Sequence, residues 1–348
     1  MSAENLVSQI DRERRRVDFD SFDFSVKELV SMAYESVINI APEYQRQFRW
    51  PKENQSTLIE SILLGIPVPN LFMAANRDGT WELIDGVQRL STLISFLGDP
   101  EVLAKLGFAE PLRLEGLKIL TEFNGFLFVD LPQSVRLKFQ LRPLKVTTLS
   151  DKSDNKIRFD LFERLNTGGV KLTSQEVRAC VFRGEFNDFI YELAKNEDFR
   201  VVVNLPESAL IDGACEELVL KFFAYLYDAQ SFSHSVIDFL NDFMVKASER
   251  FDYKSAREVF VLTFSALRRE LPEGIKRGSR RLTPINLYEA ISVGAAKAVM
   301  QGVNICGRNV AIWMNDAELT RLTSGATNSS RRLAARVDYC FERFGGNV

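Results

Sequence analysis

The chain has 348 residues, a length that fits two domains or one domain with a large extension. Hydrophobic residues make up 46% of it and charged residues 26%, which is typical of a folded globular protein and excludes disorder along most of the chain. The net charge of −3 argues against a protein that coats nucleic acid without specificity, but it allows a local basic groove.

Cysteine, histidine and hydropathy exclude further classes. The four cysteines form no CxxC pair, so we expect reduced thiols rather than a disulfide framework or a zinc site. The single histidine, His234, excludes a histidine-rich zinc centre and an HNH-type nuclease centre, and we expect it to cap a helix or lie on the surface. No apolar run approaches the roughly 20 residues that span a bilayer, and the charged N-terminus has no apolar signal core. A cytoplasmic protein with no membrane partner is therefore predicted.

The first half of the chain alternates helix and strand signals after a flexible N-terminus over residues 1–22. Ser25 and Glu28 have the spacing of a capping box, which opens a helix to about Tyr34. A short strand is predicted over 37–40. Next come a loop and then a helix that has Pro51 in its first turn and ends at Gly65.

Strands over 71–74 and 81–84 are predicted to form a hairpin through a glycine-containing turn. After Gly86 the apolar period changes to that of a helix, which ends at Gly98. The same reasoning predicts the remaining sheet elements, which are a second hairpin over 117–120 and 126–129 and a strand over 145–148.

From about Asp154 every strong signal is helical. Thr173 and Glu176 form a second capping box, and the abundance of Phe predicts aromatic packing between helices. Helical periodicity is found near 185–195, 213–228, 235–249, 255–269, 284–301 and 329–344. We therefore predict an α+β fold, with a small mixed-sheet domain over 23–150 and a mainly α-helical domain over 151–348.

The segment Ile84-Asp85-Gly86-Val87-Gln88-Arg89 carries the first candidate site, because a strand there runs into a helix through a glycine. A helix start offers unpaired N–H groups and the positive end of the dipole, and Arg89 adds a donor for phosphate. Asp85 fits either the helix N-cap or a ligand of Mg²⁺. The alternative is a capped turn with Arg89 as a surface charge.

Two further segments suit the same ligand. Tyr44-Gln45-Arg46-Gln47-Phe48-Arg49-Trp50 interleaves arginines with aromatics, as in loops that contact phosphates and stack on bases, although the aromatics also fit as anchors in the core. Asn166 and Thr167, before Gly168 and Gly169, suit either a simple helix stop or a loop that closes over a ligand.

A basic stretch from Arg268 to Arg281 holds six Lys or Arg and two acids, and Arg331, Arg332 and Arg336 add a second basic face. A nucleic-acid groove is one interpretation and a solvated helix end is the other. The nucleic-acid contacts predicted on the first interpretation are Arg49, Lys276, Arg277, Arg280 and Arg281.

Taken in order, four segments resemble the family of GmrSD restriction endonuclease N-terminal domains, known by the DGQQR motif and a ParB/sulfiredoxin-like fold. The segments are Tyr44-Gln45-Arg46 with Trp50, Ser61 to Pro69, Ile84 to Leu93, and Phe162 to Gly169. The resemblance implies a component of a DNA restriction or anti-phage defence system that binds, and in the family hydrolyses, a nucleoside triphosphate such as GTP, ATP or CTP.

Carried over by position, the resemblance gives Asp85, Gln88 and Arg89 catalytic roles, with Asp85 as the ligand of Mg²⁺. The nucleotide-binding residues it implies are Arg46, Gly86, Arg89, Asn166 and Thr167. It also implies DNA as a partner, bound directly or through a partner nuclease subunit, and leaves a homo-oligomer open.

Two departures from the family pattern bear on activity. The first glutamine of the motif is Val87 here, which cannot orient an attacking water, so we expect hydrolysis to be weakened. No histidine set is present for a C-terminal HNH nuclease domain. The alternatives to an NTP-binding component are a DNA-binding or scaffolding subunit with a degenerate site, or a metal-dependent nickase that uses Asp85.

Overall fold

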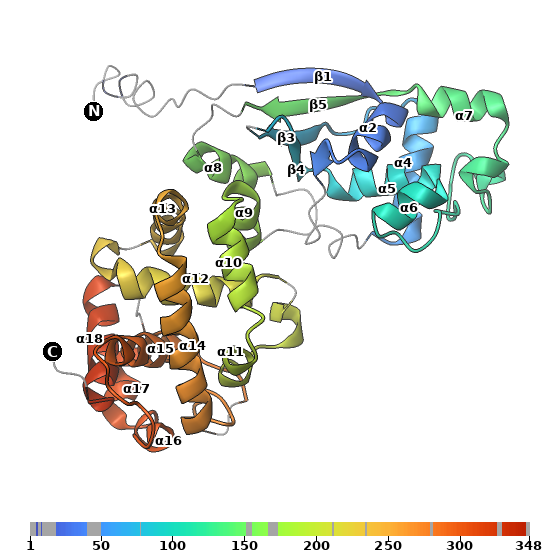
Figure 1. Ribbon diagram of the computed structural model, residues 1–348. Helices are drawn as coiled ribbons and strands as arrows, with labels where there is room; N and C mark the ends of the chain where they lie inside the picture. The colour runs from blue at the N-terminus through green and yellow to red at the C-terminus, as the bar shows by residue number, and fades with distance from the viewer. Residues whose placement is uncertain are drawn as a thin grey trace. The chain divides into compact units, whose positions relative to one another are not determined.

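A computed structural model describes residues 19–39, 50–76, 78–150, 155–165, 173–210, 212–233, 235–278, 281–325 and 329–345, together with residues 5 and 8 (Figure 1). The chain divides into two compact units, Met1–Leu172 and Thr173–Val348. The first unit holds a five-stranded mixed sheet and the second is helical, which confirms the predicted α+β class. Among the described residues, no helix is both long enough and apolar enough to cross a membrane.

The sheet of the first unit has the strand order β1–β5–β3–β4–β2. The predicted hairpin is confirmed as β3 (Leu71–Ala75) and β4 (Trp81–Asp85), which pair antiparallel. The short strand β2 (Ile38–Asn39) runs parallel to β4 at one edge of the sheet.

At the other edge, β1 (Phe19–Ser25) pairs antiparallel with β5 (Pro143–Leu149), which in turn lies parallel to β3. The predicted strand over 145–148 is thus confirmed within β5. β1 has no counterpart among the predicted elements, because its only strand partner is β5, which lies far along the chain.

Helices pack together against the sheet, and the local signals set where they begin and end. α2 (Val26–Tyr34) begins where the Ser25 hydroxyl accepts a hydrogen bond from the Glu28 N–H at 3.2 Å. α4 (Lys52–Leu64) and α5 (Val87–Leu97) end at glycines with positive φ, Gly65 and Gly98, as predicted. Short α6 (Pro100–Lys105) and then α7 (Gln133–Gln140) follow.

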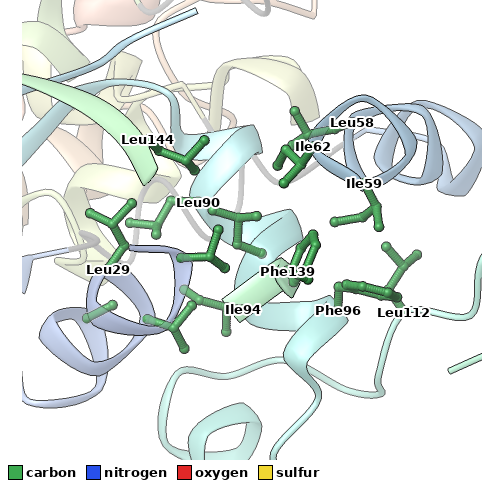
Figure 2. Close-up of a cluster of buried hydrophobic side chains, with 14 of the residues drawn as sticks. Leu29, Leu58, Ile59, Ile62, Leu90, Ile94, Phe96, Leu112, Phe139 and Leu144 are labelled. Atoms are coloured by element: carbon green, nitrogen blue, oxygen red, sulfur yellow. The ribbon is translucent and has the colours of Figure 1, made fainter. Parts of the chain in front are cut away.

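The core of the first unit lies around α5. Figure 2 shows Leu90, Ile94 and Phe96 of α5 between Leu29 of α2 and the side chains of α4, and all of them are buried. Phe139 of α7 closes the cluster, with its ring centroid 5.2 Å from that of Phe96. Because α5 packs against core side chains on two sides, its position in the unit is fixed. The residues of its first turn are therefore held in place.

The hairpin predicted over 117–120 and 126–129 is wrong. The segment contains the 3-10 turns η1 (Thr121–Phe123) and η2 (Phe128–Asp130) instead of strands. The Glu60 carboxylate of α4 accepts hydrogen bonds from the N–H groups of Ile119 and Leu120, at 2.9 and 2.8 Å. A side chain therefore takes the donors that a strand ladder needs, and the local apolar pattern did not reveal it.

α8 (Asn155–Leu165) also belongs to the first unit and packs against β4. Arg158 reaches from α8 to the end of β3, where its Nη2 donates to the carbonyl oxygen of Ala75 at 3.3 Å. Phe159 and Phe162 are buried.

The second unit is a set of helices joined by turns and loops (Figure 1). The six predicted helices are confirmed, and the capping box at Thr173 and Glu176 opens a further one, α9. The helices not predicted are short, because few residues carry their periodicity. The described helices and 3-10 turns of this unit are α9 (Ser174–Val181), α10 (Glu185–Leu193), α11 (Glu197–Val202), η3 (Glu207–Leu210), α12 (Ala214–Tyr227), η4 (Ala229–Ser231), α13 (Val236–Glu249), α14 (Tyr253–Glu270), α15 (Ile285–Met300), α16 (Val310–Trp313), α17 (Ala317–Thr323) and α18 (Ser330–Arg343).

Phenylalanine packing between these helices is confirmed. Phe222 and Phe223 of α12 contact Phe260 of α14 with ring centroids 5.4 and 5.9 Å apart, and Phe199 of α11 contacts Phe264 at 5.2 Å. Edge and stacked ring contacts of this kind add to the free energy gained by burying the rings.

Candidate functional site

The first candidate site is the turn from β4 into α5, which we call the 85–89 corner (residues 85–89). Its backbone depends on Gly86, which has φ +107° and ψ 15°. A Cβ at this position would lie 2.2 Å from Cδ2 of buried Leu71 on β3, so both the dihedral angle and the close approach require glycine. Gly86, not Asp85, is the N-cap residue of α5, and α5 has neither a side-chain cap nor an acid in its first turn. The helix therefore starts with backbone donors that no capping side chain takes.

Arg89 folds back over this start. Its Nη2 lies 2.7 Å from Oδ2 of Asp85, and its Nη2 and Nε lie 3.3 and 3.4 Å from where a Cβ of Gly86 would be. The side chain of Arg89 is 13% exposed and that of Asp85 35% exposed, so the pair is partly shielded from water. Arg89 is thus not a freely extended surface charge, and its guanidinium lies beside the helix start.

Gln88 ties the corner to the end of the aromatic segment 44–50. Its Oε1 accepts a hydrogen bond from the Trp50 N–H at 3.1 Å, and Nε2 of Gln55 donates to the Trp50 carbonyl oxygen at 2.8 Å. Two glutamines therefore hold the backbone of Trp50, Gln88 from α5 and Gln55 from α4. The side chain of Val87 is partly buried against the core, so it offers the corner no polar group.

Five of the predicted site residues lie outside the described residues, and so does His234. For Arg46, Arg49, Asn166, Thr167 and Arg280 the assigned roles stay predictions. Of the predicted site residues that the structure describes, four lie together in one corner, namely Asp85, Gly86, Gln88 and Arg89.

Asp85 was predicted to hold Mg²⁺. No group of three or more His, Cys, Asp or Glu in the described part of the chain has the arrangement of a metal site. Mg²⁺ commonly takes one or two protein carboxylates and completes its shell with phosphate oxygens and water. Among the described residues, Asp85 therefore has no partner ligands for a metal site made by protein alone.

The basic stretch 268–281 is partly used within the second unit. Lys276 forms an ion pair with Glu273. The Arg277 guanidinium donates to the hydroxyls of Thr320 and Thr323 of α17, and burial lowers the pKa of Arg277. Arg281 is exposed.

Arg336 does not belong to a basic surface, contrary to the expectation from the sequence. It is 2% exposed and pairs with Glu289 of α15, which is 5% exposed. Lys221 of α12 lies 3.9 Å from the same Glu289 and 3.0 Å from Glu217, which also accepts from Arg178 of α9 at 3.2 Å.

These five charges form a buried ionic network across α9, α12, α15 and α18, which the helical periodicity did not predict. Burial raises the pKa of Glu289, and its two cationic neighbours only partly offset this effect. One signal in the sequence was available. Lys221 interrupts the apolar run 218–225, where a charge needs a buried partner.

Comparison with known proteins places the corner inside a recognised domain. Residues 26–183 match the family described as GmrSD restriction endonuclease, N-terminal domain. No curated protein and no solved structure matches the chain. The matched residues include most of the sheet, the 85–89 corner, α8 and α9.

Proposed function

We propose that the 85–89 corner binds the phosphates of a nucleoside triphosphate, since residues 26–183 match the GmrSD restriction endonuclease N-terminal domain, a family that implies a role in a restriction or defence system. The observation that carries the proposal is the uncapped start of α5 at Gly86 with the Arg89 guanidinium beside it. Backbone N–H groups, the helix dipole and an arginine converge there, and each favours a phosphate group.

Arg89 has enough donors to bond the Asp85 carboxylate and a phosphate group at the same time. A guanidinium carries five N–H donors, and the hydrogen bond to Asp85 uses Nη2. Partial burial strengthens each contact relative to a surface arginine, because fewer water molecules compete for it.

Asp85 would hold a magnesium ion that accompanies the triphosphate. When bound, the ion would neutralise part of the phosphate charge. Asp85 and Arg89 would then act together. Without a ligand, the carboxylate orients the guanidinium. With the nucleotide and the metal bound, the carboxylate would interact with both Arg89 and the metal.

We propose that the corner binds a nucleotide, and we do not propose that it hydrolyses the nucleotide rapidly. Val87 is partly buried against the core and has no polar atom in its side chain, and Gln88 is bonded to the Trp50 backbone. Neither side chain is arranged to orient a water molecule, so any hydrolysis is expected to be slow. The same proposal includes the partners expected of a restriction component. These are DNA, a partner nuclease subunit and further copies of this chain.

Isothermal titration with GTP, ATP and CTP in the presence of Mg²⁺ tests the proposal. Arg89→Ala removes a charge-assisted hydrogen bond worth about 1.5–3 kcal/mol, so it is expected to weaken binding roughly 10- to 150-fold. Lys27→Ala is the matched control, because it removes one positive charge from an exposed position of α2. Asp85→Asn is expected to reduce the dependence of binding on Mg²⁺.

Absence of binding by the native chain at millimolar nucleotide, or equal affinities of the Arg89→Ala and native chains, would overturn the proposal. Incubation of supercoiled plasmid with Mg²⁺ or Mn²⁺ separates it from the nickase alternative. Nicking that disappears in Asp85→Ala, without any nucleotide binding, would assign the corner to DNA cleavage instead.

A further inference from the structure

A cavity of about 230 Å³ lies in the first unit beside the first turn of α4, and no residue of the 85–89 corner lines it. Gln55 of α4 and Ser95 of α5 contribute to its lining, and the rest of the wall comes mainly from the segment 106–112, which follows α6. The large apolar side chains of this wall are Leu106, Phe108, Pro111 and Leu112.

The wall is held against α5 by two hydrogen bonds and by a close approach at a glycine. The Leu112 N–H donates to the carbonyl oxygen of Ser95 at 2.8 Å, and the Ser95 hydroxyl donates to the carbonyl oxygen of Glu110 at 3.4 Å. A Cβ at Gly98, which ends α5, would lie 2.9 Å from Cβ of Pro111. The apolar wall is therefore formed before any ligand arrives, as in most sites for small molecules.

The cavity is linked to the 85–89 corner through the backbone of Trp50. Gln55, which lines the cavity, donates to the Trp50 carbonyl oxygen at 2.8 Å, and the Trp50 N–H donates to Gln88 of the corner at 3.1 Å. Ser95 follows Gln88 by seven residues of α5, so the two lie on the same side of the helix, about 10 Å apart along its axis. An extended nucleoside triphosphate holds its base about this far from its outer phosphates.

A cation lies beside the apolar wall. Nζ of Lys52, which is among the lining residues, lies 3.0 Å from Oε1 of Glu110, and the two side chains are 49% and 68% exposed. An ion pair this exposed contributes little stability, so Lys52 is able to exchange Glu110 for an anionic ligand. An apolar cavity with a cation beside it suits a ligand that is flat and apolar at one end and anionic at the other.

We infer that this cavity receives the base of the nucleotide whose phosphates bind at the 85–89 corner, and that it favours a purine. The inference rests on the proposed function. The cavity is smaller than the roughly 300–1,000 Å³ of sites that enclose drug-sized ligands, so it suits the base and not the whole nucleotide. Apolar and aromatic side chains contact the faces of bases in known sites. The two rings of a purine cover more of an apolar wall than the one ring of a pyrimidine, and the stabilisation grows with the apolar area buried.

Calorimetric titration of the full chain with ATP, GTP, CTP and inorganic tripolyphosphate, each with Mg²⁺, tests the inference. Tripolyphosphate has the phosphates without a base, so it reports on the corner alone. It carries at least as much negative charge as the nucleotides, and charge therefore does not explain tighter binding of a nucleotide. We expect ATP and GTP to bind roughly ten-fold or more tightly than tripolyphosphate, with CTP between them.

Ala109→Phe is the decisive variant, because Ala109 is an exposed residue of the lining and a ring at this position competes with the base. We expect its affinity for ATP and GTP to fall to that for tripolyphosphate, while tripolyphosphate binding and the melting temperature stay as in the native chain. Ala104→Phe is the matched control, since it makes the same change at an exposed position of α6 that does not line the cavity.

The outcomes separate this inference from the proposed function. Binding of tripolyphosphate as tightly as ATP and GTP overturns the inference and leaves the phosphate site standing. The inference is also overturned if CTP binds as tightly as ATP and GTP, or if Ala109→Phe binds ATP as the native chain does. Absence of binding by all four probes overturns the proposed function, and the inference with it.

Discussion

Replacing Gly86 with alanine tests the backbone of the 85–89 corner. An alanine at φ +107° is strained by about 1–3 kcal/mol. Its Cβ would also lie 2.2 Å from Cδ2 of Leu71, a core residue that is 2% exposed. Displacing a packed core side chain costs about 1–3 kcal/mol more. The free energy of unfolding of the first unit is therefore expected to fall by about 2–6 kcal/mol in Gly86→Ala.

Gly79→Ala separates the two causes. Gly79 lies in the β3–β4 turn with φ +84°, and a Cβ there meets no atom within 4 Å. Its replacement carries only the backbone strain, which is taken to be the same, about 1–3 kcal/mol. The difference between the two variants, about 1–3 kcal/mol, measures the contact between residue 86 and Leu71.

Urea unfolding followed by tryptophan fluorescence is the assay. Trp50 and Trp81 lie in the first unit against its core, so a Trp313→Phe background removes the signal of the second unit. With a urea dependence of about 2 kcal/mol per molar, the midpoint of Gly86→Ala is expected about 0.5–1.5 M below that of Gly79→Ala. Equal midpoints would refute the reasoning that Leu71 leaves no room at Gly86.

Two further predictions concern the second unit. Burial alone would raise the pKa of Glu217, but Lys221 and Arg178 outweigh it and the pKa lies below its usual 4.5. The stability that this carboxylate contributes is therefore present above pH 4.5 and is lost as the pH falls through the lowered value. Glu217→Gln should lose about 1–3 kcal/mol at pH 7 and show a flatter decline in acid. Urea unfolding between pH 7 and 3 measures this against Glu249→Gln, an exposed control, and parallel pH profiles for the two variants would contradict it. The second prediction is that one thiol of the native chain, Cys306, reacts rapidly with a disulfide reagent at pH 8, because Cys180, Cys215 and Cys340 are buried and burial raises the pKa of Cys215 to about 11. A rapid thiol that persists in Cys306→Ser would show that a buried cysteine is accessible.

The sequence by itself determined the elements whose causes are local. Ser25 caps α2, Thr173 and Glu176 cap α9, and Gly65 and Gly98 end their helices as predicted. Such caps act within one helical turn, so their residue types and spacing suffice to predict them. The change of apolar period at Gly86 predicted the strand–glycine–helix turn for the same reason.

Contacts between distant residues decided the rest. Glu60 turned the predicted 117–129 hairpin into 3-10 turns, and β1 exists because β5 supplies its partner. Distant contacts also define the 85–89 corner. Leu71 of β3 leaves no room for a side chain at Gly86, and the Trp50 N–H donates a hydrogen bond to Gln88.

In the second unit, the buried network around Glu289 had no counterpart among the predicted sites. Periodicity shows which side of a helix is apolar, but it does not show which polar residues of different helices meet inside. Whether a buried charge or amide finds its partner depends on the packing of whole helices, and only the tertiary structure decides that.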